Sequence, residues 1–488
     1  MTPWTIMKIQ RRYGMNRSGL AAAVASAVLF GALHAFAAKS ATQAPDFQAA
    51  RDEAAAILQD FVRIDTSNPP GNETKGAQYL KTVLDREGIP SEIFELAPGR
   101  GNIVARLKGS GKKPPILLMG HLDVVGVERD KWTVDPFGGT VKDGYIYGRG
   151  SSDDKGMATA CLEVFLLLHR IKAPLDRDVI YLAEAGEEGT PEAGIEYMAR
   201  EHWDKIGCEF ALNEGGVMYK LNDKIQYVGI ATTEKVPNGM KLVAHGTSGH
   251  GSMPRLDNAI THLAAAVAKV GSWQAPMRLN DTTRAFFARL ATISPPEQAA
   301  LYRALEDARN SQNAQQRLRE TSIGYNSMLR TSIVPTIIKG GFRTNVIPAE
   351  AEAALDVRAL PDENIDALIA ELKRIIDDPA VEVVRNSRGR RPASAPSRLD
   401  TEMCKALEKA QKTLFPDAIT IPMMLTGATD SAELRAKGVQ AYGLGSMMSD
   451  EDRSRIHGND ERISIEGLGK LVELIYRAVA SVAGTQSP

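Results

Sequence analysis

The chain has 488 residues, of which 43% are hydrophobic and 24% are charged. This composition is that of an ordinary globular protein, and it excludes disorder, collagen and coiled coil as descriptions of the whole chain. At about 150 residues per domain, the length suggests two or three domains. The formal net charge of −1 gives no global basic field, so we do not expect nucleic acid as a partner.

Residues 1–37 are typical of a secretory signal peptide. Four basic residues precede an apolar run over 20–33, which is followed by the small-x-small sequence Ala35-Phe36-Ala37. A membrane anchor is the alternative, but a helix over 20–33 would span about 21 Å of a hydrocarbon core that is about 30 Å thick. We therefore expect a periplasmic or secreted protein with no stable membrane span after cleavage.

After this leader, helical patterns alternate with short apolar runs. Residues 47–64 predict a helix, and the runs at 116–119, 179–183 and 210–212 predict buried strands. This alternation predicts an α/β fold with a mainly parallel sheet that has helices on both faces. In such sheets, ligands bind at the carboxyl ends of the strands.

The middle of the chain has a different pattern. A Gly-rich strand-like segment, a helix, a polar helix-prone stretch and further strand-like runs precede a tract over 388–396 that is rich in Arg, Ser and Pro and is typical of a linker. The last part returns to alternating strands and helices. We predict a smaller α+β domain over 236–390, inserted into a catalytic domain that is made of residues 46–235 and 391–488.

Two histidines and several carboxylates fall mostly just after strand-like runs: His121, Asp123, Asp153, Asp154, Glu187, Glu188, Glu214 and His457. Taken singly, each residue has an alternative to metal binding: a structural hydrogen bond, a helix cap or a solvated surface position. At one sheet edge they would form a mixed nitrogen and oxygen site, which suits Zn²⁺ and, with more carboxylates, Mn²⁺ or Co²⁺. The carboxylates are numerous enough for two ions with a bridging carboxylate, and a further carboxylate could move the proton of an activated water.

In these segments the chain resembles the M20 metallopeptidases and amidohydrolases. This family includes glutamate carboxypeptidase, aminoacylase and the deacylases of acetylornithine and succinyl-diaminopimelate. The matching pieces run from Ile64-Asp65-Thr66 to His457, with 32 residues from His121 to Asp153 and 35 from Asp153 to Glu188. The resemblance implies a catalytic domain that binds two metal ions and an inserted domain for lid closure and dimerisation, so a second copy of the chain is an implied partner.

The resemblance also implies roles for the residues at the sheet edge. Five of them resemble the family's metal ligands, with one histidine for each ion: His121, His457, Asp153, Glu188 and Glu214. Asp153 resembles the bridging ligand, and Asp154 stays open as its alternative. Asp123 resembles the carboxylate that orients His121, and Glu187 resembles the general base.

Three other segments resemble the family's substrate pocket. His250 resembles a histidine that enters the active site of a partner subunit and stabilises the oxyanion; a strand-turn histidine is the alternative. Asn345 and Arg358 resemble a substrate-binding pair in which the arginine binds a carboxylate, with a surface ion pair as the alternative. Thr429 lies in a loop that resembles a wall of the same pocket. A plain Gly-rich turn is the alternative.

We therefore expect an exported amidohydrolase with two zinc ions, in which a metal-bound hydroxide attacks and Glu187 is the base. The substrate would be a peptide with a scissile C-terminal bond or an N-acyl amino acid. Family aminopeptidases tend to have Asp where this chain has Glu214, but an aminopeptidase or dipeptidase is still the nearest alternative. A non-catalytic metal-containing binding protein is the second alternative, which the intact Asp123 and Glu187 disfavour.

Overall fold

The computed structural model describes residues 45–307, 309–386 and 391–484. The predicted signal peptide lies outside these residues, so it stays a prediction. None of the helices in the described ranges combines the length and the apolar character that a bilayer crossing requires.

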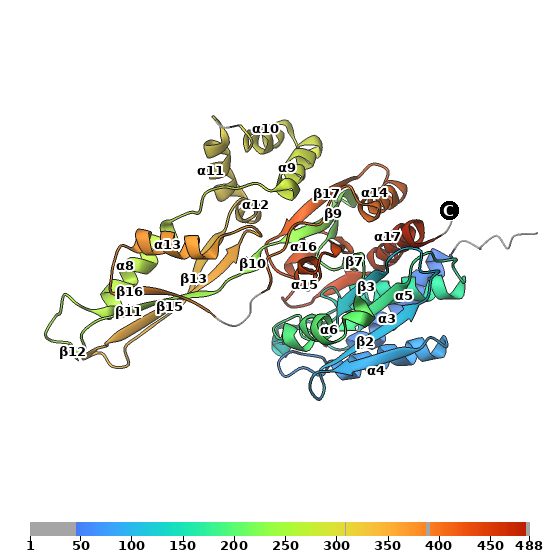
Figure 1. Cartoon of the computed structure of the whole chain (residues 1–488), viewed down its shortest axis with the longest axis horizontal. Helices are drawn as coiled ribbons and strands as arrows, with labels where there is room; N and C mark the ends of the chain where they lie inside the picture. Colours follow the sequence, from blue (N-terminus) through green and yellow to red (C-terminus); the bar gives the residue numbers. More distant parts are fainter. Residues whose placement is uncertain (1–44, 308, 387–390, 485–488) are drawn as a thin grey trace, which may run out of the picture. The chain divides into compact units, whose positions relative to one another are not determined.

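The larger sheet has ten strands, and its centre is parallel (Figure 1). The central strands are, in sheet order, β6 (Val179–Glu184), β3 (Ile116–His121), β7 (Phe210–Asn213) and β18 (Gln440–Gly443). Ile116 is in register with both Val179 and Phe210, so the three strands predicted from the sequence end at one edge. The predicted α/β fold with a mainly parallel sheet is confirmed.

Antiparallel strands extend this sheet on both sides. They include the pair β1 (Ser91–Glu95) and β2 (Gly101–Leu107), and β9 (Lys224–Glu234) with β8 (Val217–Leu221). β17 (Ile419–Leu425) and β19 (Met447–Met448) complete the sheet by parallel pairing with β9 and β8. The connection over 96–100 is too short for a parallel crossover, which needs about a dozen residues, so β1 and β2 pair in opposite directions.

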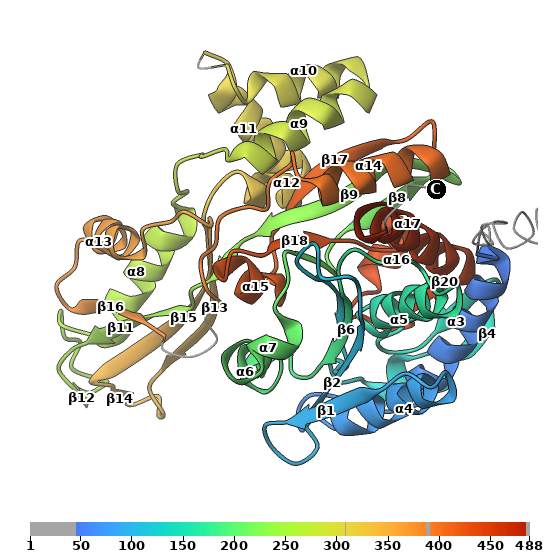
Figure 2. The same cartoon turned by 45° about the vertical axis from the view of Figure 1, so that its right-hand side comes forward.

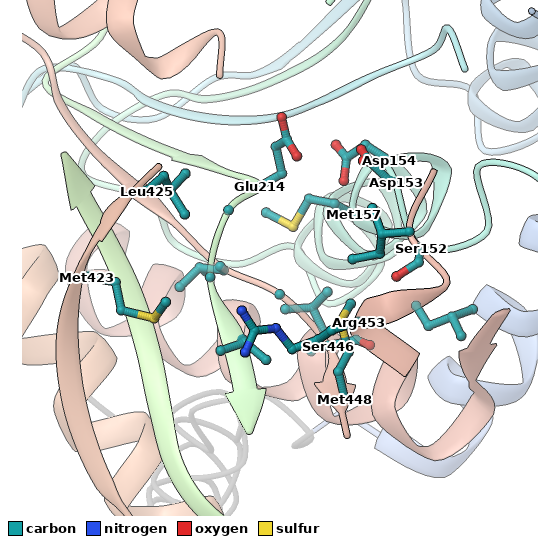
Figure 3. A pocket seen from close by; sticks show the side chains of 18 residues that line it. Ser152, Asp153, Asp154, Met157, Glu214, Met423, Leu425, Ser446, Met448 and Arg453 are labelled. Carbon is teal, nitrogen blue, oxygen red and sulfur yellow. The ribbon is translucent and has the colours of Figure 1, made fainter. Parts of the chain in front are cut away.

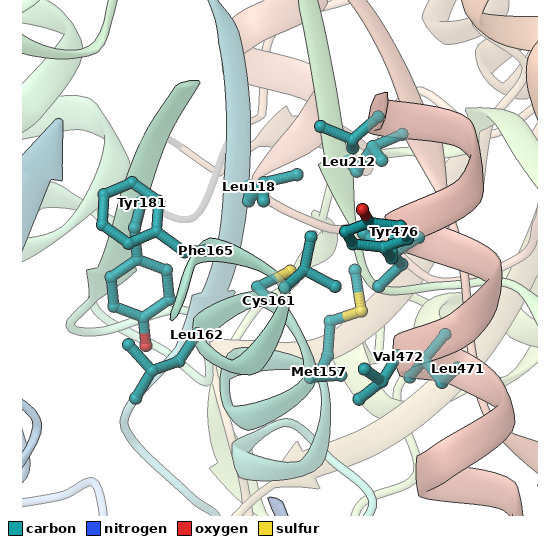
Figure 4. Packing of buried hydrophobic residues seen from close by; sticks show 14 of the residues in the cluster. Leu118, Met157, Cys161, Leu162, Phe165, Tyr181, Leu212, Leu471, Val472 and Tyr476 are labelled. Carbon is teal, nitrogen blue, oxygen red and sulfur yellow. The ribbon is translucent and has the colours of Figure 1, made fainter. Parts of the chain in front are cut away.

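Helices cover both faces of the larger sheet. One face packs against α3 (Phe47–Val62), α4 (Glu73–Arg86), α5 (Lys155–Arg170), α14 (Glu402–Leu414) and α17 (Ile465–Ala483). The other packs against α6 (Ile195–Glu201), α7 (Trp203–Ile206) and α15 (Ser431–Ala436). Leu118 and Tyr181 join the first cluster (Figure 4), whereas their neighbours Leu117 and Ile180 join the second. Successive strand residues thus alternate between two buried layers, which explains the continuous apolar runs.

A second sheet lies within residues 236–385. Its five strands are β10 (Val236–Pro237), β15 (Glu350–Ala359), β11 (Met240–His245), β16 (Val381–Arg385) and β13 (Ser332–Gly340), all paired antiparallel. Leu263 of α8 (Ala259–Ser272) and Leu372 of α13 (Ile365–Ile376) share one hydrophobic cluster with this sheet. β12 (Gly249–His250) and β14 (Val346–Ile347) form a separate short pair. The domain boundaries at 236 and 390 stay predictions.

The polar stretch inside the predicted insert forms helices that pack on the larger sheet (Figure 2). They are α9 (Asp281–Ile293), α10 (Pro296–Ala304), α11 (Ser311–Thr321) and α12 (Ile323–Met328). Phe286 and Tyr302 belong to one buried cluster with Ile421 and Met424 of β17. Asn280 and Thr283 form a capping box that fixes the start of α9.

Short elements complete the described fold. They are a small sheet of β20 (Arg462–Ser464), β5 (Tyr145–Tyr147) and β4 (Thr140–Lys142), the helix α16 (Asp450–Ser454), and 3₁₀ turns at Arg129–Lys131 and Pro191–Ala193. β20 follows directly after the segment that contains His457, so its pairing with β5 helps to fix that segment.

Candidate active site

The carboxyl ends of three adjacent strands supply the centre of the site. His121 is the last residue of β3, and Glu214 follows the end of β7. Glu187 and Glu188 lie in the turn after β6, which pairs with β3. The parallel register therefore brings together residues that are far apart in the sequence, as expected of an α/β sheet.

Asp153 lies between the two histidines. Its Oδ1 is 3.0 Å from Nε2 of His121, and its Oδ2 is 3.1 Å from Nε2 of His457. Nε2 of His457 is also 2.9 Å from Oε1 of Glu188. The peptide bond between Asp153 and Asp154 is cis. The carboxylate of Asp154 is buried and accepts a hydrogen bond from the backbone N–H of His121, at 3.2 Å. The structure therefore places Asp153, rather than Asp154, between the two imidazoles.

The buried carboxylate of Asp123 organises the turn that follows β6. It accepts the backbone N–H groups of Glu187 at 3.0 Å and Glu188 at 3.1 Å, and the side-chain amide of Asn68 at 2.8 Å. The backbone carbonyl of Asp123 lies 2.8 Å from Nδ1 of His121. When Nδ1–H donates to this carbonyl, the Nε2 lone pair of His121 is directed at the ligand side.

Glu461 connects the segments that carry Asp153 and His457. Its buried carboxylate accepts backbone N–H groups from Ser152 at 2.9 Å and Asp153 at 3.0 Å. It also pairs with the guanidinium of Arg149 at 2.6 Å. Sequence reasoning did not single out Glu461, although it lies only four residues after His457. Its role depends on a contact across more than 300 residues, which no local pattern reveals.

Arg391 is a second residue that sequence reasoning missed. Its Nη2 lies 3.1 Å from Oε1 of Glu187, and its Nη1 pairs with the carboxylate of Asp430. All three side chains are largely buried. Arg391 lies in the tract over 388–396 that was interpreted as a linker, where one arginine among several carries no distinguishing signal.

The electrostatics of the cluster favour a bound cation. Burial and repulsion by nearby carboxylates raise the pKa of Glu187 and of Glu214 well above the ordinary range. Hydrogen bonds to Asp153 and Glu188 raise the pKa of His457 to about 10. Burial lowers the pKa of His121, but the hydrogen bonds to Asp123 and Asp153 outweigh it and raise the pKa overall. The cluster therefore has more buried negative charge than the protein itself neutralises.

The donor atoms are close enough together to hold metal ions. Three sets have ligand atoms within 4.8 Å of one another: His121, Asp153 and Glu214; Asp153, Glu188 and His457; and His121, Glu187 and Glu188. The first two sets share Asp153, as a bridging carboxylate would require. Their donors are imidazole nitrogens and carboxylate oxygens, which fit Zn²⁺, Mn²⁺ or Co²⁺.

These acidic residues open into a cavity of about 470 Å³. Its wall includes Asp153, Glu187, Glu188, Glu214 and His457, together with two arginines, Arg358 and Arg391. Asp356 accepts hydrogen bonds from Nε of Arg358, the shorter at 2.9 Å. The cavity thus combines metal-binding donors with the guanidinium of Arg358, a group that suits a carboxylate ligand.

Thr429 does not line this cavity, whereas Gly427 and Ala428 of the same loop do. The Thr429 backbone N–H and hydroxyl donate to the buried carboxylate of Glu234, at 3.0 and 2.7 Å. The structure therefore gives Thr429 a role in fixing the loop, and its predicted contact with substrate stays a prediction.

His250 lies on the short β12–β14 pair, and Asn345 directly precedes β14. The backbone carbonyl of Asn345 accepts the N–H of Gly251 at 2.9 Å, and Nδ1 of the exposed His250 accepts the hydroxyl of Ser252 at 2.7 Å. Neither residue is among those that line the cavity described above. Within this one chain, the structure does not bring them to the metal-binding donors.

The fold and the donor cluster define an α/β protein with a site suited to metal ions. The sequence model of Peptidase family M20/M25/M40 matches residues 117–481, and the chain belongs to this family. The predicted family and the prediction of a hydrolytic enzyme are thereby confirmed.

Two relatives illustrate the activities found among similar sequences. The chain is 32% identical over 381 residues to a probable carboxypeptidase S-like 2 from Dictyostelium discoideum. The matched region covers 75% of this chain and 71% of that protein. It is 29% identical over 440 residues to the N-fatty-acyl-amino acid synthase/hydrolase PM20D1 from Homo sapiens. The matched region covers 86% of each protein.

Solved structures of the family share the fold. The M20 family metallo-carboxypeptidase Sso-CP2 from Sulfolobus solfataricus matches 88% of this chain and 99% of its own, with a TM-score of 0.68 and 18% identity. The Bacillus subtilis YXEP protein, a dinuclear metal binding peptidase, matches 89% of this chain and 98% of its own, with a TM-score of 0.58 and 15% identity.

Proposed function

We propose that this M20 hydrolase is an exported, zinc-dependent enzyme that cleaves an N-acyl amide of an amino acid or a C-terminal peptide bond. The observation that carries the proposal is the position of Asp153 between His121 and His457, beside Glu187 and in a cavity that contains Arg358. The names of the Dictyostelium and human relatives support the peptide and the N-acyl substrate respectively.

His121, Asp153 and Glu214 would hold one ion, and Asp153, Glu188 and His457 the other. The chemistry that zinc would supply at these residues is a lowered pKa of a bound water and polarisation of the scissile carbonyl. Glu461 would keep Asp153 in position through the backbone N–H groups of Ser152 and Asp153. Asp123 would do the same for His121 and for the turn of Glu187 and Glu188.

Glu187 would act as the general base and then deliver its proton to the leaving nitrogen. Burial raises the pKa of its carboxyl, and a base whose pKa lies closer to neutrality transfers protons in both directions more readily. Arg391 would fix the carboxylate orientation by pairing with Glu187 and Asp430 at once.

Arg358 would select substrates with a free carboxylate. The hydrogen bonds to Asp356 use its Nε, so the terminal nitrogens of the guanidinium are the ones offered to a ligand. A bidentate arginine–carboxylate pair of this kind fixes both position and orientation. This arrangement favours the carboxypeptidase or acylase reaction over an aminopeptidase.

His250 and Asn345 would complete the site of a second copy in a homodimer. They lie at the β12–β14 pair, His250 within β12 and Asn345 directly before β14, and do not line the cavity of their own chain, which supports an action in trans. His250 would then stabilise the developing oxyanion of the partner's substrate. Export follows from the predicted signal peptide over 1–37 and stays part of the proposal.

The test is an assay of the mature chain, from residue 38 onward, reconstituted with zinc. N-acyl amino acids and dipeptides would each be supplied with a free and an amidated carboxyl terminus, and Glu187→Gln would be the control. The proposal predicts cleavage of free-carboxylate substrates only, abolished in Glu187→Gln. Cleavage that depends on a free amino terminus would identify an aminopeptidase instead, and no cleavage despite bound metal would indicate a binding protein.

A further inference from the structure

Lys235 is a buried cation at the junction between the larger sheet and the second sheet. It lies between β9, which ends at Glu234, and β10, which begins at Val236. Its side chain is completely buried, and its ammonium has no carboxylate partner among the described residues. Such a group is uncommon, because a buried lysine is normally paired with an opposite charge.

The ammonium of Lys235 instead donates to two hydroxyls. Its Nζ lies 3.1 Å from Oγ of Ser327, in α12, and 2.8 Å from Oγ of Ser332, the first residue of β13. The backbone N–H of Lys235 donates to the carbonyl of Leu425, the last residue of β17, at 2.9 Å. Lys235 thus connects a strand of the larger sheet to the start of a strand in the second sheet.

This connection reaches the strand neighbours of Arg358. Ser332 is in register with Arg358 on one side of β15, and Pro237 is in register with it on the other. Lys235 precedes Pro237 by two residues and bonds to Ser332, so it links the two residues that flank Arg358. A guanidinium binds a carboxylate through a fixed planar fork, so its effect depends on where the backbone places it.

The same connection reaches the metal-binding end of the site. The side chain of Leu425 lines an apolar cavity of about 210 Å³, together with the proposed metal ligands Asp153 and Glu214 (Figure 3). Lys235 therefore relates the strand beside these ligands to the strands beside Arg358. The distance that a substrate spans from its scissile amide to its carboxylate depends on this relation.

The charge of Lys235 also acts on the carboxylate site. Burial, Arg358 and Arg330 lower the pKa of Lys235 to about 7, against the opposing effect of Asp356. The ammonium thus lies close enough to Arg358 for the two cations to repel each other. A carboxylate bound at Arg358 would offset this repulsion and favour the charged form of Lys235.

We propose that Lys235 is a positioning residue for the carboxylate site: it holds Arg358 in place relative to the metal-binding donors and adds a second positive charge beside it. The proposal rests on the function proposed above and identifies a further residue that determines its specificity. Lys235 is not among the residues that line the cavity around Arg358, so it acts through Arg358 and the neighbouring strands rather than by touching the substrate.

The test is a binding measurement on zinc-loaded protein in the Glu187→Gln background, where substrate is not turned over. N-acetyl amino acids and their carboxyl amides would be titrated into this parent and into the same protein with Lys235→Met. Methionine keeps a long unbranched side chain but removes the charge and the two hydrogen bonds. We expect the preference for the free carboxylate to fall about tenfold, with the affinity for the amide unchanged.

Two further variants in the same background complete the design. Ser332→Ala removes one hydrogen bond of Lys235 and should lower the preference less. Lys241→Met is the matched control, because Lys241 lies in the same sheet but is 42% exposed and pairs with Glu352 at 3.0 Å; its preference should match that of the parent. Melting curves check folding, and Ser332→Ala decides the question if Lys235→Met does not fold.

The outcomes separate this proposal from the proposed function. A parent that prefers the free carboxylate, and loses this preference in Arg358→Met but not in folded Lys235→Met, would overturn the role of Lys235 while the carboxylate site stands. Equal losses of affinity for the acid and the amide in Lys235→Met would show a purely structural lysine and also overturn it. A parent that binds acid and amide equally would contradict the proposed carboxylate site itself, and the role of Lys235 with it.

Discussion

Replacement of Arg391 by methionine tests whether this side chain holds the proposed base in place. Its guanidinium joins the carboxylates of Glu187 and Asp430. The side chains of Arg391, Glu187 and Asp430 are 7%, 12% and 1% exposed, so all three charges are almost completely removed from water. Arg391→Met would leave two buried carboxylates without their shared cation.

The expected cost follows from this burial. Removing one partner of a buried ion pair costs about 3–5 kcal/mol, because the remaining charge stays desolvated. We expect Arg391→Met to lower the free energy of unfolding by that amount. We also expect kcat to fall about 100-fold, because a displacement of a catalytic group by about 1 Å has an effect of that size. Arg391→Lys keeps the charge but not the planar fork, so its losses should be smaller.

Urea unfolding and steady-state kinetics on an N-acyl amino acid measure both quantities. Arg398→Met is the matched control in the same segment, since Arg398 pairs with Asp400 at 2.8 Å but both side chains are more than 60% exposed. The control should change the free energy of unfolding by less than about 1 kcal/mol and leave kcat unaltered. An Arg391→Met protein that matches the wild type in stability and in kcat would show that Arg391 does not hold Glu187 in place.

Three other predictions concern buried groups. Burial raises the pKa of Glu163 from 4.5 to about 8, so the free energy of unfolding falls as the pH rises between these values. Glu163→Gln should therefore add about 3 kcal/mol to the free energy of unfolding at pH 7 and flatten its pH dependence in urea. An unchanged pH profile would contradict this. Glu461→Gln should weaken metal affinity about 10- to 100-fold by loosening Asp153, as measured by competition with a chelator; wild-type affinity would exclude that role. Thr429→Val should cost about 1.5–3 kcal/mol through its lost hydrogen bond to Glu234, with KM unchanged; a raised KM would support the predicted substrate contact instead.

Local sequence patterns were enough to predict three of the four central strands. The apolar runs at 116–119, 179–183 and 210–212 form β3, β6 and β7, and the polar residues that follow them share one sheet edge. These features depend on strand burial and parallel register, which leave a signal in adjacent residues. The antiparallel strands β1 and β2 were not predicted. β1 is partly exposed, and the buried part of β2 includes Gly101 and Asn102, so its apolar run is short.

Contacts between distant segments could not be read from the sequence. Arg391 reaches Glu187 across 204 residues, and Glu461 reaches Asp153 across 308. The choice between Asp153 and Asp154 likewise depends on the turn that orients them, since the two residues are adjacent and chemically identical. The apolar cavity beside Glu214 is assembled from β8, β17, β19, β20 and the start of α5, so no single segment predicts it.

In the proposed reaction, Asp153 would be a ligand at both metal sites and Glu187 would act on a substrate beside them. Metal content per chain, measured together with hydrolysis of an N-acyl amino acid, tests it most directly in the wild type, Asp153→Asn and Glu187→Gln. We expect two ions and activity in the wild type, two ions without activity in Glu187→Gln, and loss of both in Asp153→Asn. Full metal content and activity in Asp153→Asn, or full activity in Glu187→Gln, would contradict it.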